Sequence, residues 1–338
     1  MAKLYLSQPG LKVNLNHGKF IVSLNGETLH TVPELYVEGI IVMAPVQVTY
    51  AVTASVLERG GTITYLARNG DVQGILGLDV QQGRQVLLQA AAHLDPAKKL
   101  RVARGMLQRK LQAQRQLLLR YNKSLHSDEL TEAAERLQMY ADRLTACTSV
   151  KAMLGVEGTA SKEYYDCFPL LLKNSDYTWE GRSRRPPRDP VNSMLSFAYG
   201  LVERAVQLEV MHAGLTCGIG FLHGVNDYKN GFVYDVMESF RTLAAERTVF
   251  RCINRRIFSP DDFDRVGDAC YLSSDARKRF IIQFSECARE KGFYGTNLSE
   301  AIKKELLLIR KDFGDDTVDF NEENLYEKEK EVETHENA

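Results

Sequence analysis

The composition of the chain changes abruptly near residue 82, and this change constrains its fold more than any other feature. The first 80 residues carry short β-forming runs separated by turn signals such as QPG, NHG and NGE. From residue 82 the sequence is rich in Leu, Ala, Gln, Lys and Arg, which are good helix formers. We therefore predict an α+β chain, with a small N-terminal β-sheet domain at 1–78, a linker at 79–84 and a larger all-α C-terminal domain at 85–311.

Local patterns place the elements within these two regions. Asn25-Gly26 lies between FIVSL and ETLHTV and predicts a two-residue β-hairpin. GIIVMA is a continuous apolar run, as in a buried strand, and a short helix is expected to end at Gly60-Gly61. TITYLA and DVQGILG are predicted strands around a turn at 68–70. Later helical patterns cover 130–147, 192–214 and 234–250, and two more start at Ser273 and Leu298.

Charge is segregated along the chain. Residues 312–338 carry eleven acidic residues against two lysines, and we predict a disordered acidic tail that aids solubility. The rest of the chain is basic, a layout typical of proteins with a polyanionic partner. No apolar run is long enough to span a membrane, no secretory signal is visible, and the six cysteines form no CxxC pair. These features indicate a cytoplasmic protein with reduced thiols.

Two basic segments are candidates for contact with nucleic acid. Residues 98–123 contain nine basic residues and no acidic one, and a one-signed helix favours phosphate binding. We select Arg104, Arg109 and Arg115 on this helix. The proline-rich loop WEGRSRRPPRDPVN adds Arg184 and Arg185 beside a helix start. Alternatively, these arginines pair with carboxylates that stabilise the domain.

A third segment, GIGFLHGVNDYKNGFVYDVMESFR, combines a histidine with paired acidic residues. Asp235 and Glu238 are three residues apart in a predicted helix and so share a face. A helix–loop–helix hairpin could bring His223 to that face and form a metal site, although such residues are also common on solvated helices and in cores. Glu157 lies between two glycines at an apparent helix start, where spacing does not identify its partner.

Four motifs, taken together and in order, resemble the CRISPR-associated spacer-acquisition integrase family. They are GVEGTASKEYY, RRPPRDPVNSMLSFAYGLV, AGLTCGIGFLH and YDVMESFR, and the resemblance covers the chain up to the acidic tail. It implies an N-terminal β domain, a helical catalytic domain and a metal-dependent DNA integrase and endonuclease. Such an enzyme joins the 3′-hydroxyl of short DNA fragments to a CRISPR repeat by transesterification.

The resemblance also implies the site. The family's catalytic positions fall on Glu157, His223, Asp235 and Glu238, and the metal ligands on the first, second and fourth of these. Asp235 is expected in or next to the ligand shell of a Mn²⁺ or Mg²⁺ ion. A mixed histidine and carboxylate site suits manganese by ligand type. Asn192 matches a family asparagine and is expected to cap a helix or support the site.

Partners follow from the same resemblance. Members bind double-stranded DNA, form homodimers through the β domain and assemble on a small ferredoxin-like companion protein. The alternative is a non-catalytic DNA-binding scaffold, which would bind DNA without cutting or joining it. A mononuclear iron oxygenase is disfavoured because His212, the nearest histidine upstream of His223, lies 11 residues away on another helix face.

Overall fold

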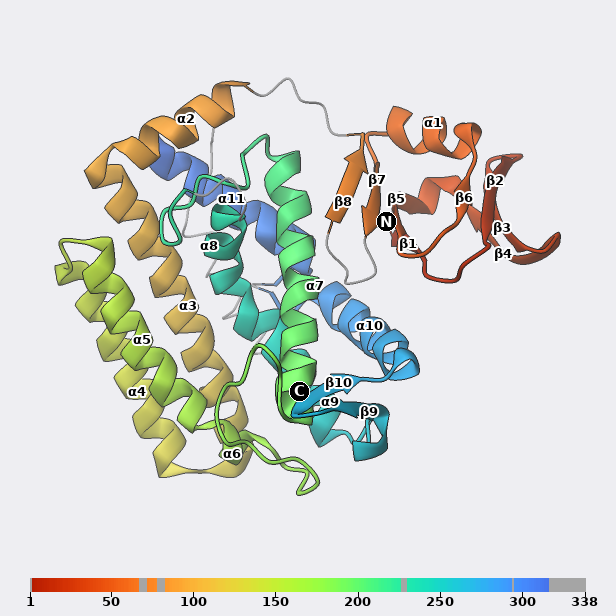
Figure 1. Cartoon of the computed structure of the whole chain (residues 1–338). Coiled ribbons are helices and arrows are strands. Elements are labelled where there is room, and N and C mark those ends of the chain that lie inside the picture. The colour runs from red at the N-terminus through yellow and green to blue at the C-terminus, as the bar shows by residue number, and fades with distance from the viewer. Residues whose placement is uncertain (1, 67–71, 78–82, 226–229, 294, 316–338) are drawn as a thin grey trace, which may run out of the picture. The chain divides into compact units, whose positions relative to one another are not determined.

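The computed structural model describes residues 2–66, 72–77, 83–225, 230–293 and 295–315. The chain forms two compact units, residues 1–81 and 82–338, which Figure 1 draws in red to orange and in orange to blue. Most of the predicted linker at 79–84 and the turn at 68–70 lie outside the described residues. Gly83 already begins a helix, so the final two linker residues are helical instead.

The N-terminal unit contains two four-stranded sheets. The first has the order β1-β5-β7-β8, with β5 parallel to both β1 and β7, and β8 antiparallel to β7. The second has the order β4-β3-β2-β6 and is antiparallel except for the β2–β6 pair. The strands are β1 Ala2–Leu6, β2 Lys12–Asn16, β3 Lys19–Leu24, β4 Glu27–Pro33, β5 Val37–Val42, β6 Gln47–Val48, β7 Thr62–Leu66 and β8 Val72–Leu76.

The predicted hairpin and buried strand are both present in this unit. Asn25 and Gly26 join β3 to β4 with φ values of 51° and 91°, the two positive values that a type I′ turn requires. Strand β5 is buried at five of its six positions, as the apolar run GIIV predicts. Helix α1 (Tyr50–Glu58) follows β6 and contributes Val52 and Val56 to the core of this unit.

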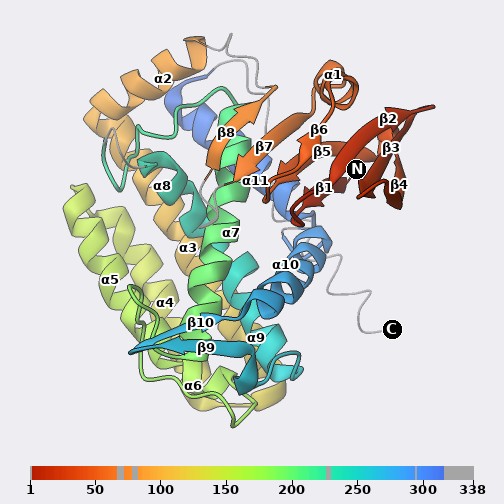
Figure 2. The same ribbon diagram turned by 45° about the vertical axis from the view of Figure 1, so that its right-hand side comes forward.

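The second unit is mostly helical, as predicted. Its helices are α2 Gly83–Leu94, α3 Pro96–Leu125, α4 Asp128–Arg143, α5 Val150–Asp166, α6 Phe168–Leu171, α7 Pro190–His212, α8 Gly231–Phe240, α9 Arg247–Asn254, α10 Ser274–Arg289 and α11 Leu298–Phe313. A π-helical segment, η3 Arg241–Glu246, joins α8 to α9 without a break. The 30-residue helix α3 contacts α4 and α5 as well as α8, and the two views show it between them (Figures 1 and 2). It is therefore a core helix.

Three sequence predictions in this unit are corrected. The domain is not entirely α-helical, because β9 (Phe263–Val266) and β10 (Ala269–Leu272) pair as an antiparallel hairpin. Glu157 lies in the middle of α5 and not at a helix start. The helical domain continues past residue 311, because α11 ends at Phe313 and buried Asp315 forms ion pairs with Arg84 and Arg310. The remainder of the predicted acidic tail, 316–338, lies outside the described residues.

In the described part of the chain, no helix combines the length and the apolar character that a membrane crossing requires. All six cysteines are free thiols, and four of them are buried.

Candidate metal centre

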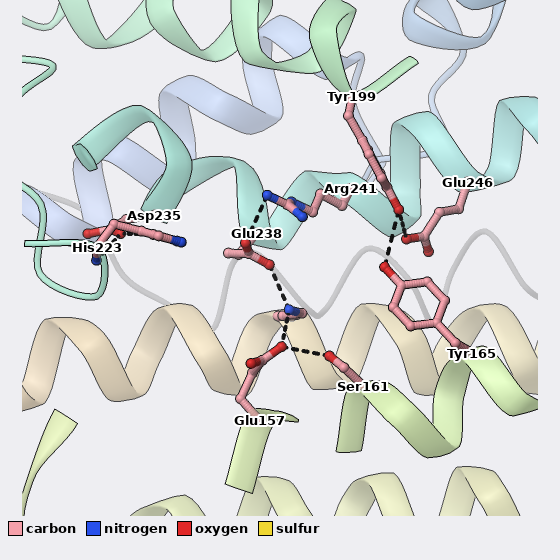
Figure 3. A network of polar contacts seen from close by, with 10 residues as sticks. Glu157, Ser161, Tyr165, Tyr199, His223, Asp235, Glu238, Arg241 and Glu246 are labelled. Carbon is pink, nitrogen blue, oxygen red and sulfur yellow. Dashed lines mark hydrogen bonds and ion pairs between the residues drawn. The ribbon is translucent and has the colours of Figure 1, made fainter. Parts of the chain in front are cut away.

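Glu157 and Glu238 come from different helices, and their carboxylates point toward each other (Figure 3). Both contact the ammonium of Lys110. Lys110 lies on α3, between α5, which carries Glu157, and α8, which carries Glu238. Its Nζ donates to Glu157 Oε1 and lies 2.7 Å from Glu238 Oε2. Two acidic side chains that are 81 positions apart in the sequence thus share one cation.

The surroundings of this pair keep Lys110 and Glu238 ionised. Burial alone would lower the pKa of Lys110, but Glu238 and Glu157 raise it above its ordinary value. Burial would raise the pKa of Glu238, but Lys110 and then Arg241 lower it to about 2. Arg241 Nη2 lies 3.2 Å from Glu238 Oε1, and the Ser161 hydroxyl donates to Glu157 Oε1 at 2.6 Å. Glu238 therefore remains a carboxylate at neutral pH.

Asp235 fixes the backbone and the side chain of His223. This fully buried carboxylate accepts the backbone N–H groups of Phe221, Leu222 and His223, the last two at 2.9 and 3.0 Å. It also contacts His223 Nδ1 at 2.7 Å. This hydrogen bond raises the pKa of His223 above its ordinary value, against the opposing effect of burial. All four of these contacts are with residues 221–223. Asp235 therefore orients the histidine and is not directed at the Glu157–Glu238 pair.

Helix α2 holds the loop that precedes His223. The buried Gln89 side chain donates to the carbonyls of Thr216 and Ile219, both at 3.0 Å, and accepts from Thr216 N at 2.9 Å. One turn later, His93 Nδ1 lies 2.9 Å from the Gly220 carbonyl. The position of His223 therefore depends on α2 as well as on Asp235.

A buried tyrosine network lies on the far side of Arg241. The hydroxyls of Tyr164 and Tyr199 each donate to the Glu246 carboxylate at 2.6 Å, and Tyr165 lies 3.3 Å from Tyr199 (hydroxyl to hydroxyl). Arg241 lies over the Tyr199 ring, 5.1 Å from its centroid. The π-helical segment contains both Arg241 and Glu246 and so joins this network to Glu238 (Figure 3).

Asn192 organises the arginine-rich loop and does not cap the helix. The cap of α7 is Asp189, whose carboxylate accepts from Asn192 N at 2.8 Å. The Asn192 side chain donates to the Gly181 carbonyl at 2.8 Å and accepts from Arg182 Nη1 at 2.7 Å. Because Arg182 also lies over the Tyr199 ring, Asn192 supports the tyrosine network indirectly.

The arginines predicted for DNA contact fall into two groups. Those on α3 point inward: Arg109 pairs with Glu305 at 2.7 Å, Arg104 donates to the carbonyls of Leu144 and Cys147, and Arg115 Nε is buried. Arg104 and Arg109 are therefore engaged with neighbouring elements, whereas Arg101 and Arg120 on the same helix are exposed, and contact of α3 with DNA stays a prediction. Arg184 and Arg185 in the loop before α7 are exposed, as predicted.

Sequence reasoning missed Lys110, Arg241 and Gln89. Arg241 follows Glu238 by three residues on one helix, so helical spacing could have paired them. Lys110 lies within the basic run 98–123, where nothing in the sequence distinguishes it from its basic neighbours. The absence of any acidic residue from that run indicates that its buried cations need partners from other helices, but it does not say which ones.

The fold and the centre define a two-unit protein in which a β unit precedes a helical unit with a cluster of carboxylates and buried cations, and with an exposed histidine that pairs with buried Asp235. Comparison with known proteins identifies the family. Residues 4–286 match the family described as CRISPR associated protein Cas1, and the chain belongs to that family.

Relatives agree with this assignment. A CRISPR-associated endonuclease Cas1 from Thermus thermophilus is 30% identical over 280 residues, which are 82% of this chain and 80% of the relative. One from Thermodesulfovibrio yellowstonii is 29% identical over 60% of this chain, and the chain spans 61% of its length. A Cas1 structure from Thermotoga maritima has the same fold, with a TM-score of 0.75 at 22% identity over 95% of this chain and all of that one.

Proposed function

We propose that this protein is the metal-dependent DNA integrase and endonuclease of CRISPR adaptation. The observation that carries the proposal is the convergence of Glu157 and Glu238 on one cation position. His223 is held by Asp235, which lies on α8, the helix that also carries Glu238. The similarity to CRISPR-associated endonucleases of the same family supports it. A casposase bound to an integration product also shares the fold, with a TM-score of 0.74.

The donor set fits a divalent ion. Lys110 Nζ is a positive charge within hydrogen-bond distance of both carboxylates, so their oxygens already face a common cation position. Oxygen and imidazole donors together suit Mn²⁺, and Mg²⁺ is the alternative. Glu157, Glu238 and His223 would hold the ion, and Asp235 would keep the imidazole in the orientation to bind it.

When bound, such an ion would polarise the target phosphate and lower the pKa of the attacking hydroxyl. The residues of this chain would then position the reactants. Arg241 supplies a buried positive charge beside Glu238, and its guanidinium lies over the ring of Tyr199, whose hydroxyl donates to Glu246. Fixed charges of this kind stabilise a developing phosphorane charge without reorganisation. With a DNA 3′-hydroxyl as nucleophile the outcome is strand joining, and with water it is cleavage.

DNA would reach this centre along exposed cations. Arg184 and Arg185 are exposed on a loop that Asn192 and Asp189 fix to the start of α7. A restrained arginine loop suits contact with phosphates. We further propose that the protein acts as a homodimer formed by its β unit, together with a small ferredoxin-like companion protein. Solved structures with this fold include a Cas6-RT-Cas1–Cas2 complex and a Cas1–DNA complex.

The test is strand transfer of a short 3′-hydroxyl duplex into supercoiled DNA that carries a CRISPR repeat, with Mn²⁺ and the companion protein. We expect joining by the wild-type protein and at least about a hundredfold loss in the Glu157→Gln variant. The Lys162→Met variant, which changes an exposed residue on the same helix, is the control. If wild type and Glu157→Gln bind DNA equally and neither cuts nor joins it, the protein is a DNA-binding scaffold.

A further inference from the structure

The ammonium of Lys110 occupies the one position that both candidate metal-binding glutamates face (Figure 3). We propose that Lys110 is an exchangeable internal cation. It neutralises Glu157 and Glu238 in the metal-free protein, gives way when a divalent ion binds them, and then pairs with a phosphate of the bound DNA. This inference rests on the proposed function, because it takes the same two carboxylates as metal ligands.

The ammonium of Lys110 and a divalent metal ion cannot occupy the position between Glu157 and Glu238 at the same time. Lys110 Nζ lies 2.7 Å from Glu238 Oε2 and donates to Glu157 Oε1. A divalent ion that bound the same oxygens would lie about 2.0–2.6 Å from each, in the volume that the ammonium now fills. Lys110 and Glu238 are only 8% and 6% exposed, so solvent would do little to screen the repulsion between the two cations.

The present arrangement of donors agrees with this exclusion. Across the part of the chain that the structure describes, no three His, Cys, Asp or Glu side chains are arranged to hold a metal ion. The geometry is instead that of an ion-pair network, Glu157–Lys110–Glu238–Arg241. Binding of a divalent ion therefore requires a rearrangement, and departure of the ammonium is the change that frees both carboxylates at once.

The released ammonium has a direction in which to move. The side chain of Glu157 is 19% exposed and that of Glu238 is 8% exposed, so the α5 side of the pair is the more open one. Replacement of the singly charged ammonium by a divalent metal ion also raises the positive charge at this position. A DNA phosphate would compensate this charge and give Lys110 a new partner. Metal binding and DNA binding are therefore expected to strengthen each other.

The first experiment measures Mn²⁺ binding without DNA, by the electron paramagnetic resonance signal of free Mn²⁺. It compares the wild-type protein with Lys110→Met, which keeps an unbranched side chain but removes the ammonium, and with Lys110→Arg, which keeps the charge. Lys162→Met controls for the loss of a distant lysine. We expect Lys110→Met to bind Mn²⁺ about tenfold more tightly or better, and the other two to bind no more tightly than wild type.

Equal or weaker Mn²⁺ binding by Lys110→Met would overturn the exchange. Glu157→Gln separates this failure from a failure of the proposed function. If Glu157→Gln weakens Mn²⁺ binding while Lys110→Met leaves it unchanged, the metal centre stands and the exchange is wrong. If Glu157→Gln binds Mn²⁺ like wild type, the ion binds elsewhere and both proposals fail.

A second measurement needs no variant and so does not depend on the folding of Lys110→Met. Acetylation of wild-type Lys110 by a small amine-reactive reagent is followed by mass spectrometry with and without Mn²⁺. Release from the two carboxylates should raise the acetylation rate of Lys110 severalfold and leave Lys162 unchanged, and added duplex DNA should reverse the increase. An acetylation rate of Lys110 that Mn²⁺ leaves unchanged would contradict the proposal.

Discussion

Three carboxylates are buried near one another in the helical unit, and each is stabilised in a different way. Asp235 accepts backbone N–H groups, Glu238 faces two cations, and Glu246 accepts two tyrosine hydroxyls. Buried charges persist only when such partners repay their loss of hydration. The partners therefore differ in kind: Glu238 faces the side chains of Lys110 and Arg241, whereas Asp235 accepts backbone N–H groups of residues 221–223.

This difference leads to a prediction for Asp235→Asn. An amide has one acceptor oxygen where the carboxylate has two, and its NH₂ group would face backbone donors. We expect the free energy of unfolding of the metal-free protein to fall by about 2–3 kcal/mol. Urea unfolding measures it, with the exposed Asp166→Asn as control. A gain in the stability of the metal-free protein would instead indicate that Asp235 is a strained metal ligand.

Glu246 offers a matched pair with Glu163, because both carboxylates accept a tyrosine hydroxyl. Glu246 is 1% exposed, whereas the side chain of Glu163 is 26% exposed and pairs with Arg136 and Tyr140. We expect Glu246→Gln to lower the free energy of unfolding by about 2 kcal/mol and Glu163→Gln to lower it by less than about 1 kcal/mol. Equal losses, measured by chemical denaturation, would show that burial does not govern these bonds.

At the scale of elements, helix α2 holds the loop that carries His223 in place through hydrogen bonds. Gln89→Leu replaces the polar side chain by an apolar one of similar size and removes three hydrogen bonds to Thr216 and Ile219. We expect amide hydrogen exchange in residues 216–225 to rise at least about tenfold, because local opening costs less. Exchange in α4 should not change. Gln138→Leu, on the exposed face of α4, is the control.

An unchanged exchange rate in this loop would show that Asp235 alone holds it. Asp235 contacts the backbone of residues 221–223 only, so protection of residues 216–220 is the sensitive part of the measurement.

Local chemistry made most elements predictable. The Asn25-Gly26 turn and the Asp189-Pro190 helix start follow from backbone preferences that need no tertiary partner. The break between α2 and α3 is also predictable from the sequence, because Asp95 caps the helix that Pro96 begins. The β9–β10 hairpin was missed because it is only four residues per strand and is embedded among helices.

The centre was less predictable because its contacts are tertiary. The resemblance supplied Glu157, His223, Asp235 and Glu238, but it could not show that Asp235 binds the backbone of 221–223. The basic run on α3 was interpreted as a surface because all of its charges have one sign. Periodicity could not reveal that Glu305, Glu157 and Glu238 approach it from three other helices.

At the scale of the whole molecule, the two units have separate hydrophobic cores. Phe20 and Ile40 belong to the core of the β unit, and Phe250 belongs to that of the helical unit; neither cluster includes a residue of the other. Units with their own cores unfold as separate cooperative blocks unless an interface couples them. The whole chain is therefore expected to depart from two-state unfolding.

Phe20→Ala tests this expectation in the full chain. Phe20 is fully buried in the β unit, and its truncation should cost about 3–5 kcal/mol. We expect scanning calorimetry to show two transitions, of which this substitution lowers only one, while Phe250→Ala lowers the other. Mn²⁺ should raise only the transition that Phe250→Ala lowers, because Glu157 and Glu238 lie in the helical unit. A single transition that both substitutions and Mn²⁺ shift together would mean that the two cores unfold as one block.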